Sequence, residues 1–200
     1  MTAVMINTSY EVNIFPSTLK HAVIRAIFKN KGNPNDPQFY RPISVLNIVS
    51  KIFERSATNQ IVKHLERNNL FFSGQHAYRQ KHSTTTCLVE VTEHIHKAID
   101  NGRLVGLAST DLSKAFDTLC HNQLLRKLAN MNFGANAIEW LRSYLSNRTQ
   151  QVKFNEIVSD PTIVEAGVPQ GSILGPILFI AFTADLCSHM SVSSRHTIPG

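Results

Sequence analysis

The sequence predicts an α+β fold, and three observations support this prediction. Apolar residues recur at spacings of three and four over residues 47–70 and 85–100, which is typical of amphipathic helices. Residues 104–110 form a short run of small and apolar residues with the length of a strand. The chain has 200 residues, of which 42% are hydrophobic and 17% charged. A chain of this length buries roughly 70% of its unfolded surface, so its core needs no disulfide or metal.

The predicted elements alternate between helices and strands. Helix 47–70 places its apolar residues on one face and its basic residues on the opposite face. Helix 85–100 ends at Asn101-Gly102, a pair of residues that stops helices. The strand at 104–110 leads directly to Asp111. Further along, the pattern predicts helices at 121–132 and 136–146, strands at 149–155 and 162–167, and an apolar helix that begins near Ser172 after a glycine-rich turn.

The positive charge of the chain is concentrated in one segment. The formal net charge is +6, and the segment from Lys20 to Lys81 holds eleven Lys or Arg residues against three acidic residues, a net of +8. The rest of the chain has nine basic and eleven acidic residues, a net of −2. Such a segment suits a polyanion, because each Lys or Arg that neutralises a phosphate releases a bound counterion. Charge alone leaves open a solvated basic face without a ligand.

The sequence pattern predicts neither a membrane span nor a secretory signal in these 200 residues. The longest apolar stretch, residues 173–182, is about half of the roughly 20 residues that a spanning helix needs, and Gly175 and Pro176 interrupt it. The N-terminal residues lack a basic region followed by a continuous apolar region. The three cysteines are too widely spaced for a disulfide framework or a zinc knuckle. We expect an intracellular protein, in the nucleus or cytoplasm, that is not secreted and does not contact a membrane.

The segment Asp111-Leu-Ser-Lys-Ala-Phe-Asp117 is the first candidate for chemistry. An Asp at the end of a strand projects from rigid structure, which suits a group that must hold Mg²⁺ with hard oxygen ligands. One carboxylate is not a metal site. The sequence therefore leaves open a second interpretation, in which Asp111 caps a following helix by accepting hydrogen bonds from its first free amides.

The second candidate is the segment Gly-Val-Pro-Gln-Gly-Ser-Ile-Leu-Gly-Pro-Ile-Leu-Phe at 167–179. Gly167 and Gly171 permit a ligand to approach the backbone closely, and Pro169 stiffens the loop. The helix that follows offers free N–H groups to an anion or a base edge. The segment matches neither a Walker loop nor a dinucleotide-binding fingerprint. The alternative is that it is only a turn between a strand and a helix.

Taken together, these two segments resemble the reverse transcriptase domain of non-LTR (LINE-type) retrotransposons. That family's Asp-Leu-Ser-Lys-Ala-Phe-Asp pattern is matched at 111–117, and its Gly-Val-Pro-Gln-Gly-Ser-x-Leu-Gly-Pro-x-Leu-Phe block at 167–179. Upstream matches are Phe39-Tyr-Arg-Pro-Ile-Ser44, Ser50-Lys-Ile-Phe-Glu54, and Gln75-His-Ala-Tyr-Arg79 followed by His82-Ser-Thr84. The resemblance runs from about Phe15 to Leu186. The residues of the first two blocks favour this group over the polymerases of group II introns or telomerase.

The resemblance implies a right-hand polymerase that copies an RNA template from a DNA primer with deoxynucleoside triphosphates. Residues 1–102 would form a basic, helical, fingers-like region, and residues 103–200 would form part of the palm. The segment with a net charge of +8 falls in the fingers-like region. Two Mg²⁺ ions would assist the attack of the primer 3′-OH on the α-phosphate of the incoming nucleotide. No protein partner is implied.

The resemblance also implies roles for individual residues. Asp111 would be the catalytic residue that ligates both metal ions, with the Leu112 carbonyl assisting one. Phe116 would be the steric gate that packs under the sugar and excludes a 2′-hydroxyl, whereas Asp117 is left as structural. The implied binding residues are Gln170 and Gly171 at the nascent base pair, Arg41 and Lys51 at the triphosphate, and Arg79 and Lys81 at the nucleic acid. For Arg41 and Lys51, a solvated basic face is the alternative.

One part of the family pattern is missing from the sequence. The second metal-binding motif, Tyr or Phe followed by Ala-Asp-Asp, does not occur in the 200 residues. Thr183-Ala-Asp-Leu186 matches the family's Asn-Asp-Leu position at the end of the apolar helix instead. With one carboxylate the two-metal arrangement is expected to fail, so we expect a truncated domain that is inactive as a 200-residue chain. The alternative function is a non-catalytic RNA- or DNA-binding remnant of such a polymerase.

Overall fold

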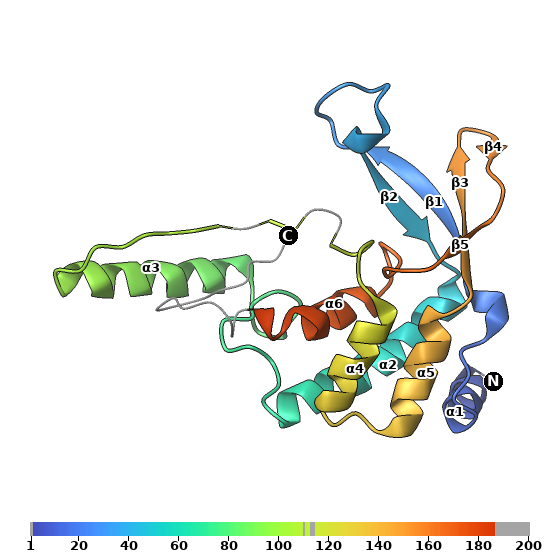
Figure 1. The fold of residues 1–200 in the computed structure, drawn as a ribbon, viewed down its shortest axis with the longest axis horizontal. Coiled ribbons are helices and arrows are strands. Elements are labelled where there is room, and N and C mark those ends of the chain that lie inside the picture. The colour runs from blue at the N-terminus through green and yellow to red at the C-terminus, as the bar shows by residue number, and fades with distance from the viewer. Residues whose placement is uncertain (1, 110, 113–114, 187–200) are drawn as a thin grey trace. The chain divides into compact units, whose positions relative to one another are not determined.

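The computed structural model describes residues 2–109, 111–112 and 115–186. The chain divides into two compact units, and each is described by itself. The first unit comprises Met1–Lys63 and Lys114–Phe182, and the second comprises His64–Ser113 and Thr183–Gly200. Figure 1 labels the helices and strands of both units.

The first unit contains a mixed β-sheet. Its strands are β1 (His21–Phe28), β2 (Tyr40–Val45), β3 (Arg148–Phe154), β4 (Ile157–Val158) and β5 (Thr162–Val164). The strand order is β2-β1-β3-β4, and β5 also pairs with β3. β1 and β3 run parallel, whereas the other pairs are antiparallel. The sheet therefore joins segments that lie more than a hundred residues apart in the sequence.

Sequence analysis did not predict β1 and β2. The β1 segment is almost continuously apolar, so its sequence lacks a clear alternation, although Ala22 and Ile24 are buried and Arg25 is exposed. β2 contains Pro42, which argues against a strand in the middle of a sheet. β2 lies at an edge of the described sheet, so the lack of an N–H at Pro42 breaks no hydrogen bond to a neighbouring strand. The region expected to be helical therefore also holds an antiparallel strand pair.

Most of the predicted helices are present. The helices of the described chain are α1 (Thr2–Glu11), α2 (Ile48–Arg67), α3 (Thr84–Asp100), α4 (His121–Asn130), α5 (Ala135–Leu145) and α6 (Gly175–Thr183). All except α1 were predicted, with boundaries that differ by a few residues. Asn69, Asn132 and Asn147 follow α2, α4 and α5 with φ of 52°, 59° and 54°. Asn tolerates this left-handed conformation, so these positions end their helices in the way that glycine often does.

The core of the first unit is built around aromatic side chains. The ring of Phe15 contacts the rings of Phe53, Trp140 and Tyr144 edge-to-face, with centroid distances of 5.8, 5.6 and 5.1 Å. Trp140 is only 3% exposed, as expected from the sequence. These residues come from the loop after α1, from α2 and from α5, so the cluster fixes the two helices beneath the sheet (Figure 1).

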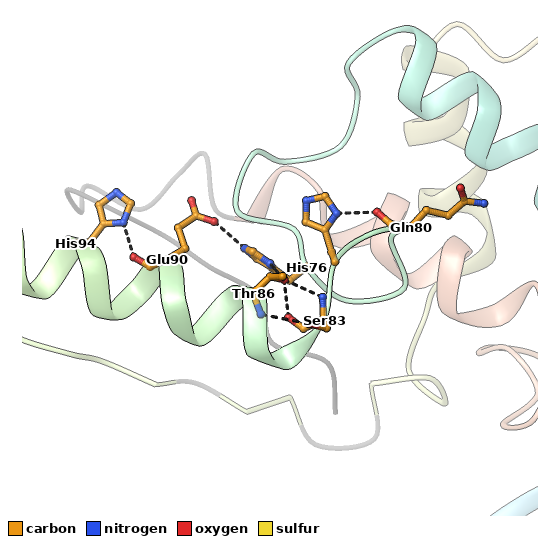
Figure 2. Close-up of polar contacts among 7 residues, drawn as sticks. His76, Gln80, Ser83, Thr86, Glu90 and His94 are labelled. Atoms are coloured by element: carbon orange, nitrogen blue, oxygen red, sulfur yellow. Dashed lines mark hydrogen bonds and ion pairs between the residues drawn. The ribbon is translucent and has the colours of Figure 1, made fainter.

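In the second unit, a polar network attaches the loop at 75–83 to the start of α3. Ser83 and Thr86 form a capping box at the N-terminus of the helix. The buried ring of His76 contacts Glu90 Oε2 through Nε2 at 2.9 Å and Thr86 Oγ1 through Nδ1 at 3.1 Å. Figure 2 shows His76 directed at both of these side chains. The helix that was predicted from periodicity is thus also anchored by side-chain hydrogen bonds.

Two predicted strands differ from the structure. Residues 103–109 have no regular secondary structure, and Leu104 and Leu107 are 102% and 79% exposed. A strand requires a paired neighbour, and none of the described strands pairs with this segment, so its composition alone does not produce one. The strand predicted at 162–167 is limited to β5, because the chain turns at Gly167, where φ is +82°. No helix in the described part of the chain is long and apolar enough to cross a membrane.

Candidate active site

The glycine-rich loop 167–171 packs directly on the turn that carries Phe116. Val168 N donates to Phe116 O at 2.8 Å, and Gly167 N donates to Leu119 O at 2.8 Å. A Cβ atom at Gly167 would lie 2.6 Å from Phe116 O and 2.8 Å from Asp117 Cα. With its positive φ, this position accepts only glycine without strain. The sequence needs Gly167 for the contact between two backbone segments.

The other end of the loop attaches to the edge of the sheet. Ser44 N in β2 donates to Gln170 O at 2.7 Å. Gly171 has φ +109°, and a Cβ atom there would lie 2.8 Å from Ser44 O. The loop thus uses a donor on the free edge of β2, where Pro42 offers none. Both glycines were expected to let a ligand approach the backbone, and in the structure it is the chain's own backbone that lies against each of them.

The two family blocks also meet through their side chains. Gln170 Nε2 donates to both carboxylate oxygens of Asp117, at 3.1 and 3.2 Å. The ring of Phe116 packs against Phe179 of α6, with 5.2 Å between centroids. The structure therefore brings Phe116, Gln170 and Gly171 together around one loop. Asp117, expected to be only structural, orients the Gln170 amide.

A buried carboxyl group, which sequence analysis noted only as part of a motif, supports this arrangement. Glu54 of α2 is fully buried and accepts hydrogen bonds from Ile173 N at 2.7 Å and from Tyr144 OH and Ser50 Oγ at 3.2 Å each. Burial, and next the charge of Glu54, raise the pKa of the Tyr144 phenol. A signal was available, because Glu54 directly follows Phe53 and lies three residues before Ala57 on the apolar face of a predicted helix.

The two residues expected at the triphosphate are both in the first unit. Arg41 is exposed on β2, opposite Ile27 of β1. Lys51 is half-buried in α2 and lines an open groove of about 500 Å³ together with Arg55, Ile173 and apolar residues of α1 and α2. Arg41 is thus three residues from Ser44, where the glycine-rich loop attaches. Lys51 lines the same groove as Ile173, which lies two residues after the loop.

Asp111 and Leu112 lie in the second unit, in a segment without regular secondary structure, and both are exposed. The alternative role of Asp111 as a helix cap is not observed: the next described helix, α4, begins at His121 after Cys120, and no side chain caps it. A carboxylate and the Leu112 carbonyl are oxygen donors of the kind that Mg²⁺ prefers. Within the described residues, however, no three His, Cys, Asp or Glu side chains gather as a metal site. These two donors alone are too few to hold the ion.

The remaining predicted residues, Arg79 and Lys81, lie on the loop before α3 in the second unit. The guanidinium of Arg79 stacks over the ring of Phe71 at 5.3 Å. Lys81 is exposed and has φ +61°. The same loop is anchored through His76 to Glu90, so Arg79 and Lys81 project from a fixed segment. The two residues are two positions apart on this loop.

The mixed α/β fold, with a glycine-rich loop on the edge of the sheet beside a turn that carries an aromatic residue, is consistent with the fingers and part of the palm of a nucleic-acid polymerase. Residues 28–198 match the family model described as "Reverse transcriptase (RNA-dependent DNA polymerase)". The chain therefore belongs to the reverse transcriptase family, and the α+β fold predicted from the sequence is confirmed.

Individual relatives agree with this assignment. The chain is 36% identical over 92% of its length to the probable RNA-directed DNA polymerase from transposon BS of Drosophila melanogaster, covering 20% of that protein. It is 32% identical over 96% of its length to the RNA-directed DNA polymerase from mobile element jockey of the same species, covering 21% of that protein. These relatives confirm the predicted resemblance to non-LTR retrotransposon reverse transcriptases. The chain spans about a fifth of their length.

Proposed function

We propose that this chain contributes the template- and nucleotide-binding part of an RNA-directed DNA polymerase of a non-LTR retrotransposon, acting in the nucleus or cytoplasm. The observation that carries the proposal is the docking of the loop 167–171 on both the Phe116 turn and the β2 edge. In this proposal, residues 1–102 are the fingers-like region and 103–200 are part of the palm. The sheet itself takes strands from both ranges.

The nucleotide would be selected beside this loop. Phe116 is supported from behind by Phe179, so its ring resists displacement by a 2′-hydroxyl and acts as a steric gate. Gly171 lets the loop lie against Ser44 of β2, and Gln170 beside it is held by Asp117 at a fixed orientation, where it would line the nascent base pair. Arg41 and Lys51 would neutralise the triphosphate. A wrong sugar would thus meet a packed aromatic ring rather than a mobile one.

The template and primer would be held by basic residues. Arg79 and Lys81 project from the anchored loop of the second unit, within the segment of net charge +8. Phosphate contacts of this kind give affinity that does not depend on base sequence and that falls as salt rises. The proposed substrates are an RNA template, a DNA primer and deoxynucleoside triphosphates.

Mg²⁺ is part of the proposal for the complete polymerase. Asp111 and the Leu112 carbonyl would supply two of its oxygen ligands. The other carboxylates that a two-metal site requires are not gathered in the described residues. We therefore expect these 200 residues to bind primer and template without extending the primer. The lack of gathered carboxylates in the described residues favours the second candidate function, a non-catalytic RNA- or DNA-binding module.

Primer extension in Mg²⁺ separates the two candidates. The 200-residue chain and its Asp111→Ala variant are each given an RNA template, a labelled DNA primer and all four deoxynucleotides. We expect both to show the same background. Extension by the unmodified chain that disappears in the variant would reject the non-catalytic alternative. If the chain also fails to bind the primer–template hybrid at low salt, both candidates are wrong.

A further inference from the structure

Three cationic side chains lie on one face of the sheet, each on a neighbouring strand. Arg25 in β1 is directly opposite Lys153 in β3 and opposite Ile43 in β2. Arg41 lies two residues before Ile43 in β2. Opposed residues on paired strands, and residues two apart on one strand, point to the same face. Arg41, Arg25 and Lys153 therefore form a row across β2, β1 and β3, which we name the cationic row.

The cationic row faces away from the core. Arg25 and Arg41 are exposed, and Ile27 and Val45 on the same face are 53% and 51% exposed. The opposite face contributes Ala22, Ile24 and Ser44, which are buried. A ligand can therefore reach the row without disturbing the packing of the first unit.

The cationic row has little negative charge to neutralise it. None of the five described strands contains Asp or Glu. In the described chain, neither Arg25 nor Arg41 has an ion pair or a hydrogen bond from its guanidinium. Lys153 lies 3.7 Å from Glu156 Oε2, but that carboxylate is 96% exposed, and solvent screening makes exposed pairs of this kind weak. The like charges of Arg25 and Lys153 on adjacent strands repel each other, and a bound anion would remove this repulsion.

The geometry of the row favours a polyanion over a single ion. Neighbouring strands are roughly 4.8 Å apart, so the three cations run across the sheet rather than converging on one point. Exposed aliphatic side chains beside them, Ile27 and Val45, offer contact to sugars or bases. The row also begins on β2, the strand whose edge holds Gln170. A chain of phosphates with apolar groups between them matches this surface.

We propose that Arg25 and Lys153 of the cationic row bind the phosphates of single-stranded RNA, beside Arg41, which remains assigned to the triphosphate. This inference rests on the proposed function, because it identifies the bound strand as template outside the primer–template duplex. It assigns a binding role to two residues, Arg25 and Lys153, that sequence analysis did not single out.

The test measures binding of the full 200-residue chain to a labelled, unstructured 12-nucleotide oligouridine by fluorescence anisotropy between 50 and 200 mM salt. The test variant is the double variant Arg25→Gln/Lys153→Gln. The matched control is Lys63→Gln/Arg126→Gln, which removes the same charge from exposed positions on α2 and α4. Both variants are checked for an unchanged thermal melt.

The slope of log K against log salt is negative. We expect the test variant to make it shallower by about 1.4, since each of the two lost phosphate contacts with a single strand contributes about 0.7. The control should keep the slope of the unmodified chain. Equal affinity and slope in the test variant and the control would overturn the inference, as would absence of RNA binding by the unmodified chain. Polyglutamate is added as a competitor at the same concentration of charges as the RNA. If it displaces the RNA, the row binds acidic polypeptides and the inference is wrong.

The proposed function fails separately, through the primer–template hybrid. A chain that binds the hybrid but shows no effect of the test variant on oligouridine retains the proposed function and loses only this inference. A chain that binds oligouridine through the cationic row but does not bind the hybrid retains this inference as a binding site and loses the polymerase proposal.

Discussion

Replacing Glu54 by alanine is expected to destabilise the first unit where α2 contacts the residues that follow the glycine-rich loop. The carboxyl group accepts hydrogen bonds from Ile173 N, Tyr144 OH and Ser50 Oγ in a site without solvent exposure. Alanine leaves these donors buried without their partner, and each unsatisfied group costs about 1–3 kcal/mol. Because the three losses overlap in one site, we expect a total of about 3–5 kcal/mol, the range for breaking a buried polar pair.

The assay is urea unfolding followed by the fluorescence of Trp140, the single tryptophan of the chain. Trp140 lies in the aromatic cluster that includes Tyr144, so it reports the folding of the first unit. For a chain of this size, the expected loss corresponds to a decrease in melting temperature of roughly 6–20 °C. Glu139→Ala is the matched control, because Glu139 is an exposed acid on α5 whose pair with Arg142 is also exposed. The control should change stability by about 0.5 kcal/mol or less.

Two further variants locate the effect. Tyr144→Phe removes the hydroxyl that donates to Glu54 and leaves no unpaired donor behind, so it should lower the free energy of unfolding by about 1 kcal/mol. In the double variant with Glu54→Ala, the losses should be less than additive, because the two groups share a hydrogen bond. If Glu54→Ala destabilised the first unit no more than Glu139→Ala does, the carboxyl group would not support the loop and the reasoning would be refuted.

Three other predictions follow from buried positions. Gly167→Ala should destabilise the chain by about 2 kcal/mol or more in urea unfolding, because its Cβ would meet Phe116 O at 2.6 Å, whereas Gly106→Ala, in an irregular exposed segment, has open space and should have little effect. Iodoacetamide at pH 8, followed by peptide mass mapping, should label exposed Cys120 well before Cys87, since burial and then the charge of a nearby Glu raise the pKa of the Cys87 thiol; equal rates would contradict this. Lys20→Met should raise the melting temperature by a few degrees, because burial and then the adjacent Arg148 charge lower the pKa of Lys20; a decrease would show that the ammonium group stabilises the fold.

Helices α2 to α5 could be predicted from the sequence because each has an apolar face with helical spacing, and α6 because an apolar run follows the glycine-rich turn, whereas α1 was not predicted. The strands were harder to predict for physical reasons. β1 is apolar on nearly every residue, and Pro42 conceals β2 because its edge position is a property of the tertiary structure. Residues 104–110 have the composition of a strand, but residues 104–109 form none in the described chain and residue 110 lies outside it, because composition cannot supply a paired neighbour.

The candidate site was predicted in part. Gly167 and Gly171 were singled out as positions where a ligand could approach the backbone, whereas the structure places another backbone segment of the chain against each. Sequence spacing could not show that this neighbour is the Phe116 turn for Gly167 and β2 for Gly171, since both contacts are long-range. Asp117 was expected to be structural, but its contact with Gln170, 53 residues away, could not be predicted from the local pattern. Contacts of this kind depend on the fold rather than on local pattern.

The central claim is that the loop 167–171 and Phe116 form the nucleotide site of a polymerase. The most direct measurement is NMR titration of the ¹⁵N-labelled chain, bound to an RNA–DNA primer–template, with Mg²⁺ and the deoxynucleotide complementary to the next template base. We predict shifts of the Phe116, Gln170 and Gly171 amides that are larger than those caused by a mismatched deoxynucleotide or by the matching ribonucleotide. The amide of Gly134, on the connection before α5, should remain unchanged. Shifts that are absent from the loop, or equal for all three nucleotides, would contradict the account.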